Sequence, residues 1–220
     1  MNVITFASCK AGAGKTTLTA QLADFAGAQR RRCLVIDADP RGSFALYNSR
    51  RAAGALPMAS AERGLERQLA VALFLGYEWV LIDTAPAVSE VVVEAMRAAT
   101  MLIIPSRPGR LDLEAVRETV DLVRCCRKPY AVVFNGAPPK SDGIESVMVS
   151  EARAFLDKQQ IPVWSGQISE RAGFVPAPGE ADRRALAADE LSWLWTMIER
   201  SIKAMYAVPA KAVGEVRAAA

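Results

Sequence analysis

The sequence predicts an α/β fold with a mainly parallel central sheet and helices on both of its faces. Short apolar segments alternate with longer amphipathic segments along the whole chain, and each apolar segment lies near a glycine, a proline or an acidic residue that can end a strand. Such alternation is typical of parallel sheets, because the helices that connect parallel strands cover both faces. The expected strands are residues 3–7, 33–36, 79–82, 101–104, 131–134 and 162–164.

Each strand is expected because its residues form a short apolar run; in chain order these runs read VITFA, CLVI, WVLI, MLII, AVVF and PVW. Such runs suit strands that are buried on both faces of a parallel sheet. The helices are expected between them because apolar residues recur there at helical spacing. In chain order the helices are residues 16–28, 61–75, 90–99, 112–124, 144–159 and 181–205.

The 220 residues are expected to form a single domain over residues 1–206. Residues 207–220 are Ala-rich with scattered charges, and we expect them to form a flexible tail. Hydrophobic residues make up 51% and charged residues 23%, which excludes a disordered or collagen-like chain. No apolar run approaches the roughly 20 residues that cross a bilayer, and no secretory signal is visible, so we expect a cytoplasmic protein.

The composition excludes several kinds of active site. Histidine is absent, which excludes every triad, general base or metal site that requires an imidazole. The four cysteines show no CxxC spacing, which argues against structural zinc and thioredoxin-like redox chemistry. The net charge of +3 does not by itself indicate nucleic-acid binding, although a clustered basic patch can still bind phosphate.

The most informative segment is the loop CKAGAGKTT, residues 9–17, which follows an apolar strand and opens a helical pattern. This context is typical of a P-loop NTPase-like fold, because small residues let backbone N–H groups converge on phosphate oxygens. Lys15 would reach the β- and γ-phosphates, and the Thr16 hydroxyl would bind Mg²⁺. The expected nucleotide-binding residues of the loop are Lys10, Ala11, Gly12, Ala13, Gly14, Lys15, Thr16 and Thr17.

Two acidic segments follow later strands. Asp37 and Asp39 stand at the end of the second strand with one residue between them, so both carboxylates point the same way if the chain is still extended. This places them over the carboxyl edge of the sheet, where open α/β sheets bind ligands. Asp83 ends the apolar strand 79–82 and can contact Mg²⁺ directly or through water.

In residues 10–17 the sequence resembles the deviant Walker A motif of the ParA/MinD family, usually KGGxGK followed by two hydroxyl residues. The DADP segment at 37–40 and the LIDTAP segment at 81–86 resemble the switch I and switch II motifs of that family. Two positions depart from the pattern: Ala11 replaces the first loop glycine, and Arg41 stands where the family usually has glutamine. The chain looks like the small, single-domain members without an N-terminal helix-turn-helix domain.

The resemblance implies roles for individual residues. Lys10 would cross a dimer interface to the nucleotide of the partner subunit, and Asp39 would orient or activate the attacking water. Asn135 would recognise adenine, or it simply ends the strand 131–134. Residues 168–176 are similar to the family segment that closes over the base. The expected catalytic residues are Lys10, Lys15 and Asp39, and the expected metal-binding residues are Thr16, Asp37 and Asp83.

The implied function is a switch that binds ATP and Mg²⁺, dimerises on ATP and binds DNA without sequence preference. Slow ATP hydrolysis, stimulated by a ParB-like or cargo adaptor protein, would serve to segregate plasmid or chromosomal DNA or to position a cellular cargo. In its ATP state the protein would associate with the nucleoid. DNA binding needs a basic patch, and the compact basic run 30–32 can equally be a solvated turn. The DNA-contact candidates late in the chain are Arg171, Arg183, Arg184, Arg200 and Lys203.

Two other functions stay open. A P-loop metabolic ligase or synthetase of the same superfamily would share the nucleotide motifs, although no second catalytic constellation for a small substrate is visible. A MinD-like positioning ATPase would bind membranes through a basic amphipathic C-terminal helix. Here Pro209 interrupts the C-terminal pattern and its apolar face is mostly alanine, so membrane binding is not expected.

Overall fold

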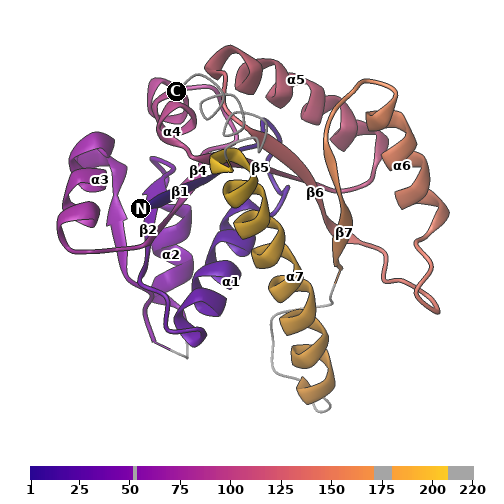
Figure 1. Ribbon diagram of the computed structural model, residues 1–220, viewed down its shortest axis with the longest axis horizontal. Helices are drawn as coiled ribbons and strands as arrows, with labels where there is room; N and C mark the ends of the chain where they lie inside the picture. The colour runs from indigo at the N-terminus through magenta and orange to yellow at the C-terminus, as the bar shows by residue number, and fades with distance from the viewer. Residues whose placement is uncertain (52–53, 171–179, 208–220) are drawn as a thin grey trace, which may run out of the picture.

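A single parallel sheet organises the chain. The computed structural model describes residues 1–51, 54–170 and 180–207, except for the side chains of residues 180–187. The described strands form a seven-stranded sheet in the order β3-β2-β4-β1-β5-β6-β7, and every neighbouring pair is parallel, which confirms the predicted fold class (Figure 1). The strands are β1 (Asn2–Phe6), β2 (Cys33–Ala38), β3 (Met58–Ser60), β4 (Trp79–Thr84), β5 (Met101–Ser106), β6 (Tyr130–Ala137) and β7 (Val163–Ser169).

Helices cover both faces of this sheet, as predicted. Helix α1 packs against α2 and α7 on one face, whereas α3, α4, α5 and α6 succeed one another on the other (Figure 1). The helices are α1 (Lys15–Ala28), α2 (Ser43–Ser49), α3 (Leu65–Phe74), α4 (Glu90–Ala98), α5 (Arg110–Cys126), α6 (Val147–Asp157) and α7 (Glu180–Tyr206), with a 3-10 turn, η1, at Ala61–Arg63.

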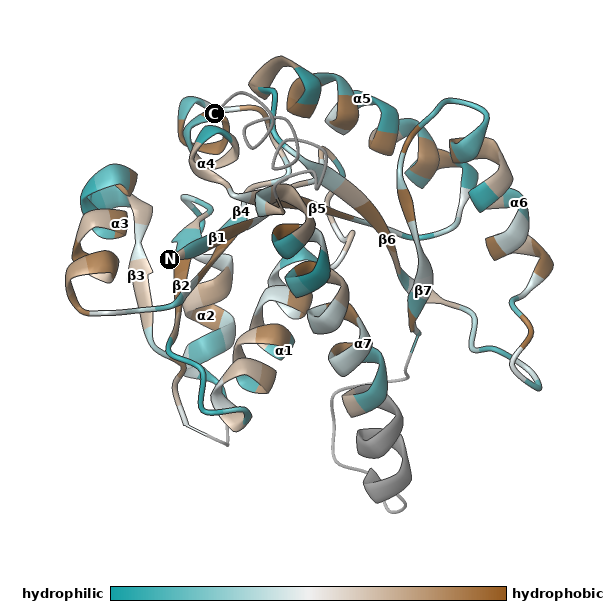
Figure 2. Cartoon of the chain, viewed as in Figure 1, coloured by the Kyte–Doolittle hydropathy of each residue, from teal (hydrophilic) through white to brown (hydrophobic). Residues whose placement is uncertain are grey.

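The two-residue period of the strands divides the core between the two faces. Ile4 and Phe6 of β1 belong to the buried cluster beneath α1 and α7, whereas Val3 belongs to the cluster beneath α3 and α4. In Figure 2 the strands β5 and β6 are brown, and α5 alternates between brown and teal. This alternation is the hydropathy pattern of an amphipathic helix on a buried sheet.

The topology places a crevice at the carboxyl end of β1. That strand lies between β4 and β5, and the chain leaves it through α1 toward β2 on one side. Later the chain returns through α4 to β5 on the other side of β1. In open α/β sheets, ligands bind at such a switch point, outside the carboxyl ends of the strands.

The structure corrects several expected boundaries. Strand β3 and helix α2 were not expected, because three and seven residues are too short to show a clear hydrophobic period. The helix expected at 61–75 is interrupted by Gly64, whose φ of 88° separates η1 from α3. The helix expected at 144–159 begins only at Val147, because the Ser146 hydroxyl accepts a hydrogen bond from Val149 N and caps it.

Trp195 of α7 packs against both the sheet and α1, within the buried cluster on the face that α1 and α7 cover. Its ring lies 4.6 Å from the ring of Trp79 on β4 and 6.1 Å from that of Phe25 on α1, centroid to centroid. The indole Nε1 donates a hydrogen bond to Glu199 Oε1, at 3.1 Å. Within the described ranges, no helix, α7 included, has both the length and the apolar composition of a membrane span.

We expect Trp195→Ala to lower the free energy of unfolding by about 3–5 kcal/mol, because it leaves a cavity between α7, β4 and α1. Urea denaturation monitored by circular dichroism measures this change. Tyr206→Ala, at a side chain that is exposed on the same helix, is the matched control and should change the free energy by less than about 0.5 kcal/mol. Equal losses in the two variants would show that Trp195 does not anchor the helix.

Candidate functional site

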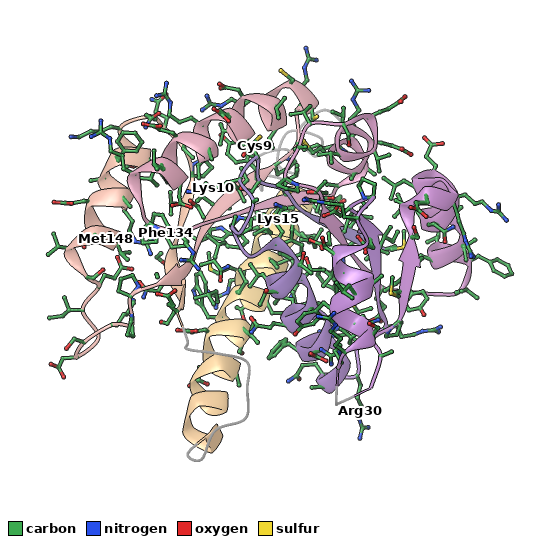
Figure 3. The ribbon with its side chains drawn as sticks, turned by 180° about the vertical axis from the view of Figure 1, so that it is seen from behind. Cys9, Lys10, Lys15, Arg30, Phe134 and Met148 are labelled. Atoms are coloured by element: carbon green, nitrogen blue, oxygen red, sulfur yellow. The ribbon has the colours of Figure 1, made fainter. Side chains whose placement is uncertain are left out.

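The candidate site lies where the carboxyl ends of β1, β2 and β4 meet. Asp37 of β2 is the register partner of Asp83 of β4, and Asp83 is also paired with Phe6 at the end of β1. Lys10 lies in the loop between β1 and α1, and Lys15 is the first residue of α1. The two lysines lie close together in Figure 3, whereas Arg30 lies beyond the other end of α1. The structure thus brings the predicted loop and both predicted acidic segments to one edge of the sheet.

The loop has the backbone shape of an anion cradle. Within residues 9–17, Gly12 and Gly14 have positive φ angles of 75° and 90°, whereas Ala11 does not. The left-handed φ of Gly14 favours glycine, and a Cβ atom there would lie 2.0 Å from Asn135 Nδ2, so a larger residue would be strained and would displace the Asn135 amide. Gly14 also caps α1 without a side-chain hydrogen bond, which leaves the first N–H groups of the helix available to an anion.

Lys15 is folded back onto this loop. Its Nζ donates to the carbonyl oxygens of Ser8, at 3.2 Å, and of Lys10, at 3.3 Å. Burial lowers the pKa of Lys15, and the nearby carboxylates of Asp83 and Asp39 offset this effect only in part. A phosphate group would supply the missing negative charge, because carbonyl dipoles alone compensate a buried ammonium group poorly.

Thr16 and Asp83 form the centre of the expected metal site. The Thr16 hydroxyl donates to Asp83 Oδ2 at 2.7 Å, and Asp83 is fully buried. Burial raises the pKa of Asp83 to about 7, although the hydrogen bond from Thr16 lowers it. Asp83 Oδ1 is buried and has no hydrogen-bond partner among the described residues. An orphaned carboxylate oxygen beside a hydroxyl fits Mg²⁺, which keeps several waters in its coordination shell.

The metal would not be held by a cage of protein carboxylates alone. In the described part of the chain, no three Asp, Glu, Cys or His side chains converge to hold an ion. Both oxygens of Asp37 instead accept backbone N–H groups, from Asp39 at 3.1 Å and from Ala45 at 2.9 Å. Burial raises the pKa of Asp37, and these hydrogen bonds counteract the rise. The geometry therefore suits a metal held by Thr16, phosphate oxygens and waters bonded to the carboxylates.

Asp39 lies two residues further, and its carboxylate is engaged by the turn that follows. Oδ1 accepts from Arg41 N at 3.0 Å and Arg41 Nε at 3.3 Å, and Oδ2 accepts from Ser43 Oγ at 2.8 Å. Burial would raise the pKa of Asp39, but the hydrogen bonds from Arg41 and Ser43 outweigh it and lower the pKa. Asp39 is therefore ionised at neutral pH.

Lys10 has a partner that the sequence did not reveal. Its Nζ lies 2.9 Å from Asp112 Oδ1, in the first turn of α5. The Lys10 side chain is 35% exposed, whereas Lys15 is 6% exposed. The two lysines of the loop thus occupy different places, one under the loop and one at the rim of the site. Sequence reasoning had no signal for Asp112, because 102 residues of chain separate it from Lys10.

A cleft of about 230 Å³ adjoins the phosphate loop on the side of β6 and β7. Asn135 lines it and donates through Nδ2 to Ala13 O at 3.0 Å. Arg107, which was not predicted, also lines the cleft, and its guanidinium lies 3.6 Å from Glu170, a residue of the segment expected to close over the base. Ile168 and Ser169, at the start of the segment expected to close over the base, face the same cleft, and residues 171–176 lie outside the described residues.

The expected DNA-contact residues are only partly described. Arg171 lies outside the described residues, and Arg183 and Arg184 lie in the part of α7 whose side chains are not described. Arg200 and Lys203 are exposed on the same helix. Arg31 Nη2 lies 3.2 Å from Glu199 Oε1, which places the basic turn 30–32 beside this part of α7.

The raised pKa of Asp83 predicts a pH dependence of stability. Because Asp83 has a pKa of about 7 in the folded state and 3.8 as its ordinary value, the folded protein holds more protons than the unfolded chain between these values. Without nucleotide or metal, the free energy of unfolding should therefore fall with rising pH in this window, by up to about 1.4 kcal/mol per pH unit from this group.

Asp83→Asn should remove this contribution, so the variant should gain stability relative to the wild type as the pH rises from about 4 to 7. Urea denaturation at several pH values measures the difference, and Asp121→Asn, at an exposed position, is the control. A difference between Asp83→Asn and wild type that is the same at every pH would contradict the buried, proton-holding carboxylate.

Comparisons with known proteins agree with this geometry. The sequence profile of the CobQ/CobB/MinD/ParA nucleotide binding domain matches residues 4–185. Maintenance of carboxysome distribution protein A from Gloeobacter kilaueensis is 34% identical over 171 residues, which are 76% of this chain and 76% of that protein.

Solved structures with lower identity share the fold. Cobyrinic acid a,c-diamide synthase from Mycobacterium smegmatis, with bound ADP and magnesium, superposes with a TM-score of 0.72 at 17% identity, over 95% of this chain and 98% of that one. Apo McdA from Cyanothece superposes with a TM-score of 0.63 at 17% identity, over 88% and 93% of the two chains. The profile match spans most of the sequence, and the chain belongs to the CobQ/CobB/MinD/ParA nucleotide-binding domain family.

Proposed function

We propose that this protein is an ATP-dependent positioning switch, which dimerises on Mg²⁺–ATP, binds DNA without sequence preference and is released by slow hydrolysis. The observation that carries the proposal is the difference in burial and in bonding partners between Lys10 and Lys15. Lys15 is buried beneath the loop, whereas Lys10 lies at the exposed rim and pairs with Asp112. In this proposal Lys15 serves the phosphates of its own subunit and leaves Lys10 for those of the partner. The relative from Gloeobacter kilaueensis, a carboxysome distribution protein, supports a positioning role.

In the proposed nucleotide complex, the side chains of the site exchange their present contacts within the chain for contacts with the nucleotide and the metal. Lys15 would leave the carbonyl oxygens of Ser8 and Lys10 for the β- and γ-phosphates. Thr16, Asp37 and Asp83 would hold Mg²⁺ and its waters, and this ion neutralises phosphate charge when it is bound. The cleft beside Asn135 would take the base, and Asp39 would orient the attacking water.

Dimerisation would follow from electrostatics. Two triphosphates that face each other repel, so a face-to-face dimer needs cations that are supplied across the interface. Lys10 is such a cation, and a two-fold axis would place one Lys10 at each partner nucleotide. The ion pair of Lys10 with Asp112 must open first. ATP therefore favours the dimer only by the difference in free energy between the contact of Lys10 with the partner's phosphates and its ion pair with Asp112.

DNA binding would use the helix face that carries Arg200 and Lys203, next to the basic turn 30–32. A dimer doubles the number of cations presented to one duplex, and phosphate contacts are the main source of sequence-independent affinity. Nucleotide state would thereby set the time that the protein spends on the nucleoid. A ParB-like or cargo adaptor that stimulates hydrolysis would release the protein from DNA near the cargo. The cargo would be a DNA molecule or a cellular body.

A metabolic synthetase is the second candidate. The observation in its favour is the superposition with cobyrinic acid a,c-diamide synthase, whose TM-score of 0.72 exceeds the 0.63 of apo McdA. A synthetase would bind the nucleotide with the same loop but would not need Lys10 for assembly or DNA for turnover. The dimerisation and DNA experiments below therefore separate the two functions.

Lys10→Ala should bind ATP nearly as well as the wild type but stay monomeric, because Lys15 and the loop N–H groups are unchanged. Multi-angle light scattering with a non-hydrolysable ATP analogue and Mg²⁺ measures the dimer fraction. Lys158→Ala, at an exposed lysine on the far end of α6, should dimerise like the wild type, and Lys15→Ala should lose nucleotide binding itself. A monomeric wild type or a fully dimeric Lys10→Ala variant would refute the switch.

The double variant Arg200→Glu/Lys203→Glu should weaken binding to random duplex DNA at low salt about tenfold or more. It should also reduce the slope of log K against log salt concentration by roughly 2, because two phosphate contacts are lost. Fluorescence anisotropy with the ATP analogue measures both values. Arg124→Glu/Lys158→Glu reverses two exposed charges on the opposite helix layer and should bind normally; equal losses in both variants would place the DNA site elsewhere.

A further inference from the structure

The turn after Asp39 occupies the carboxylate that the proposed function needs for hydrolysis. Oδ1 accepts both the backbone N–H and the side-chain Nε–H of Arg41, and Oδ2 accepts the Ser43 hydroxyl. The Asp39 side chain is only 5% exposed. Each carboxylate oxygen can accept about two hydrogen bonds, so the two Arg41 donors fill Oδ1, whereas Oδ2 accepts only the Ser43 hydroxyl. Asp39 Oδ1 can therefore accept an attacking water only after one of its two contacts with Arg41 has opened.

Of these donors, the Arg41 side chain is the one free to move. It is 68% exposed, and its terminal nitrogens make no hydrogen bond to any of the described residues. The backbone beneath it is fixed, because Gly42 N donates to Asp39 O at 2.8 Å and Gly42 adopts a φ of 64° as the cap of α2. The guanidinium is therefore attached at a defined point of the site's rim and can turn about its own side-chain bonds.

Arg41 also lies within electrostatic reach of the phosphate lysine. Burial is the main reason for the lowered pKa of Lys15; the charges of Asp83 and Asp39 oppose it, and the charge of Arg41 adds to it. Two cations that disfavour each other in the absence of an anion are both stabilised when a triphosphate arrives between them. A guanidinium suits this ligand, because its planar donors match phosphate oxygens in pairs.

We propose that Arg41 leaves Asp39 and binds the γ-phosphate of ATP. Arg41 would then make the affinity of this protein higher for ATP than for ADP. The inference rests on the proposed function, because it assumes that the triphosphate occupies the loop. With ATP bound, the guanidinium moves to the terminal phosphate and releases Asp39 Oδ1 to accept a water. With ADP bound, no γ-phosphate competes, so Arg41 stays on Asp39 and the carboxylate stays engaged.

This exchange gives a physical meaning to the departure at position 41. A glutamine, the residue that the ParA/MinD motif usually has there, can hydrogen-bond but carries no charge to neutralise a terminal phosphate. An arginine in the same place adds a cation that responds to the presence of one phosphate group. Arginines that contact the transferred phosphoryl group are a recurring device in nucleotide hydrolysis, supplied either by the same chain or by a partner.

The test compares affinities for a non-hydrolysable ATP analogue and for ADP, both with Mg²⁺, by isothermal titration calorimetry. Arg41→Gln should bind the ATP analogue about tenfold more weakly, the effect of losing one charge-assisted contact, and ADP within about twofold of the wild type. Arg41→Lys keeps the charge but loses the paired donors, so its affinity for the ATP analogue should lie between those of the wild type and Arg41→Gln. Retained ADP binding shows that the variant is folded and that its loop is intact.

Ser43→Ala is the matched control, because it removes the other side-chain donor to Asp39 and leaves the charge at position 41. It should keep the wild-type ratio of ATP to ADP affinity. The inference is overturned if Arg41→Gln keeps that ratio, or if Ser43→Ala lowers it equally, since Arg41 would then act only as a restraint on Asp39. If the wild type binds neither nucleotide, or if Lys15→Ala binds both as well as the wild type, the nucleotide site of the proposed function is refuted instead.

Discussion

The hydrogen bond between the Thr16 hydroxyl and the buried Asp83 carboxylate joins the phosphate loop to the centre of the sheet. Asp83 is the second-last residue of β4, which lies between β1 and β2, so this one contact aligns the start of α1 with three neighbouring strands. Asp83 is fully buried and leaves one oxygen unpaired among the described residues, at a cost to stability. A site that binds a metal and an anion accounts for that cost, whereas packing alone does not.

The cations around the loop share a second constraint: each is held by an acceptor of the same chain. Carbonyl oxygens hold Lys15, the Asp112 carboxylate holds Lys10, and the Asp39 carboxylate holds Arg41. A triphosphate therefore competes with existing contacts. Its net affinity is the difference between the new and the old interactions.

The two helix layers separate the proposed tasks. The layer with α1 and α7 carries the start of the phosphate loop helix at one end and, through the ion pair of Arg31 with Glu199, the basic turn 30–32 beside α7. Because α1 runs from Lys15 to this turn, the loop and the basic surface are joined by one rigid helix. In the proposed dimer, a change of subunit arrangement at the loop would therefore alter how the basic surfaces of the two subunits are presented together.

The sequence by itself determined the parallel fold, the phosphate loop and the positions of Asp37, Asp39 and Asp83, because each rests on a local pattern: an apolar run, a glycine spacing or an acidic residue at a strand end. It missed β3 and α2, which are too short to show a period. The partner of Lys10 and the cleft beside Asn135 were decided by the tertiary structure alone, because their residues come from strands and helices that only the sheet order brings together.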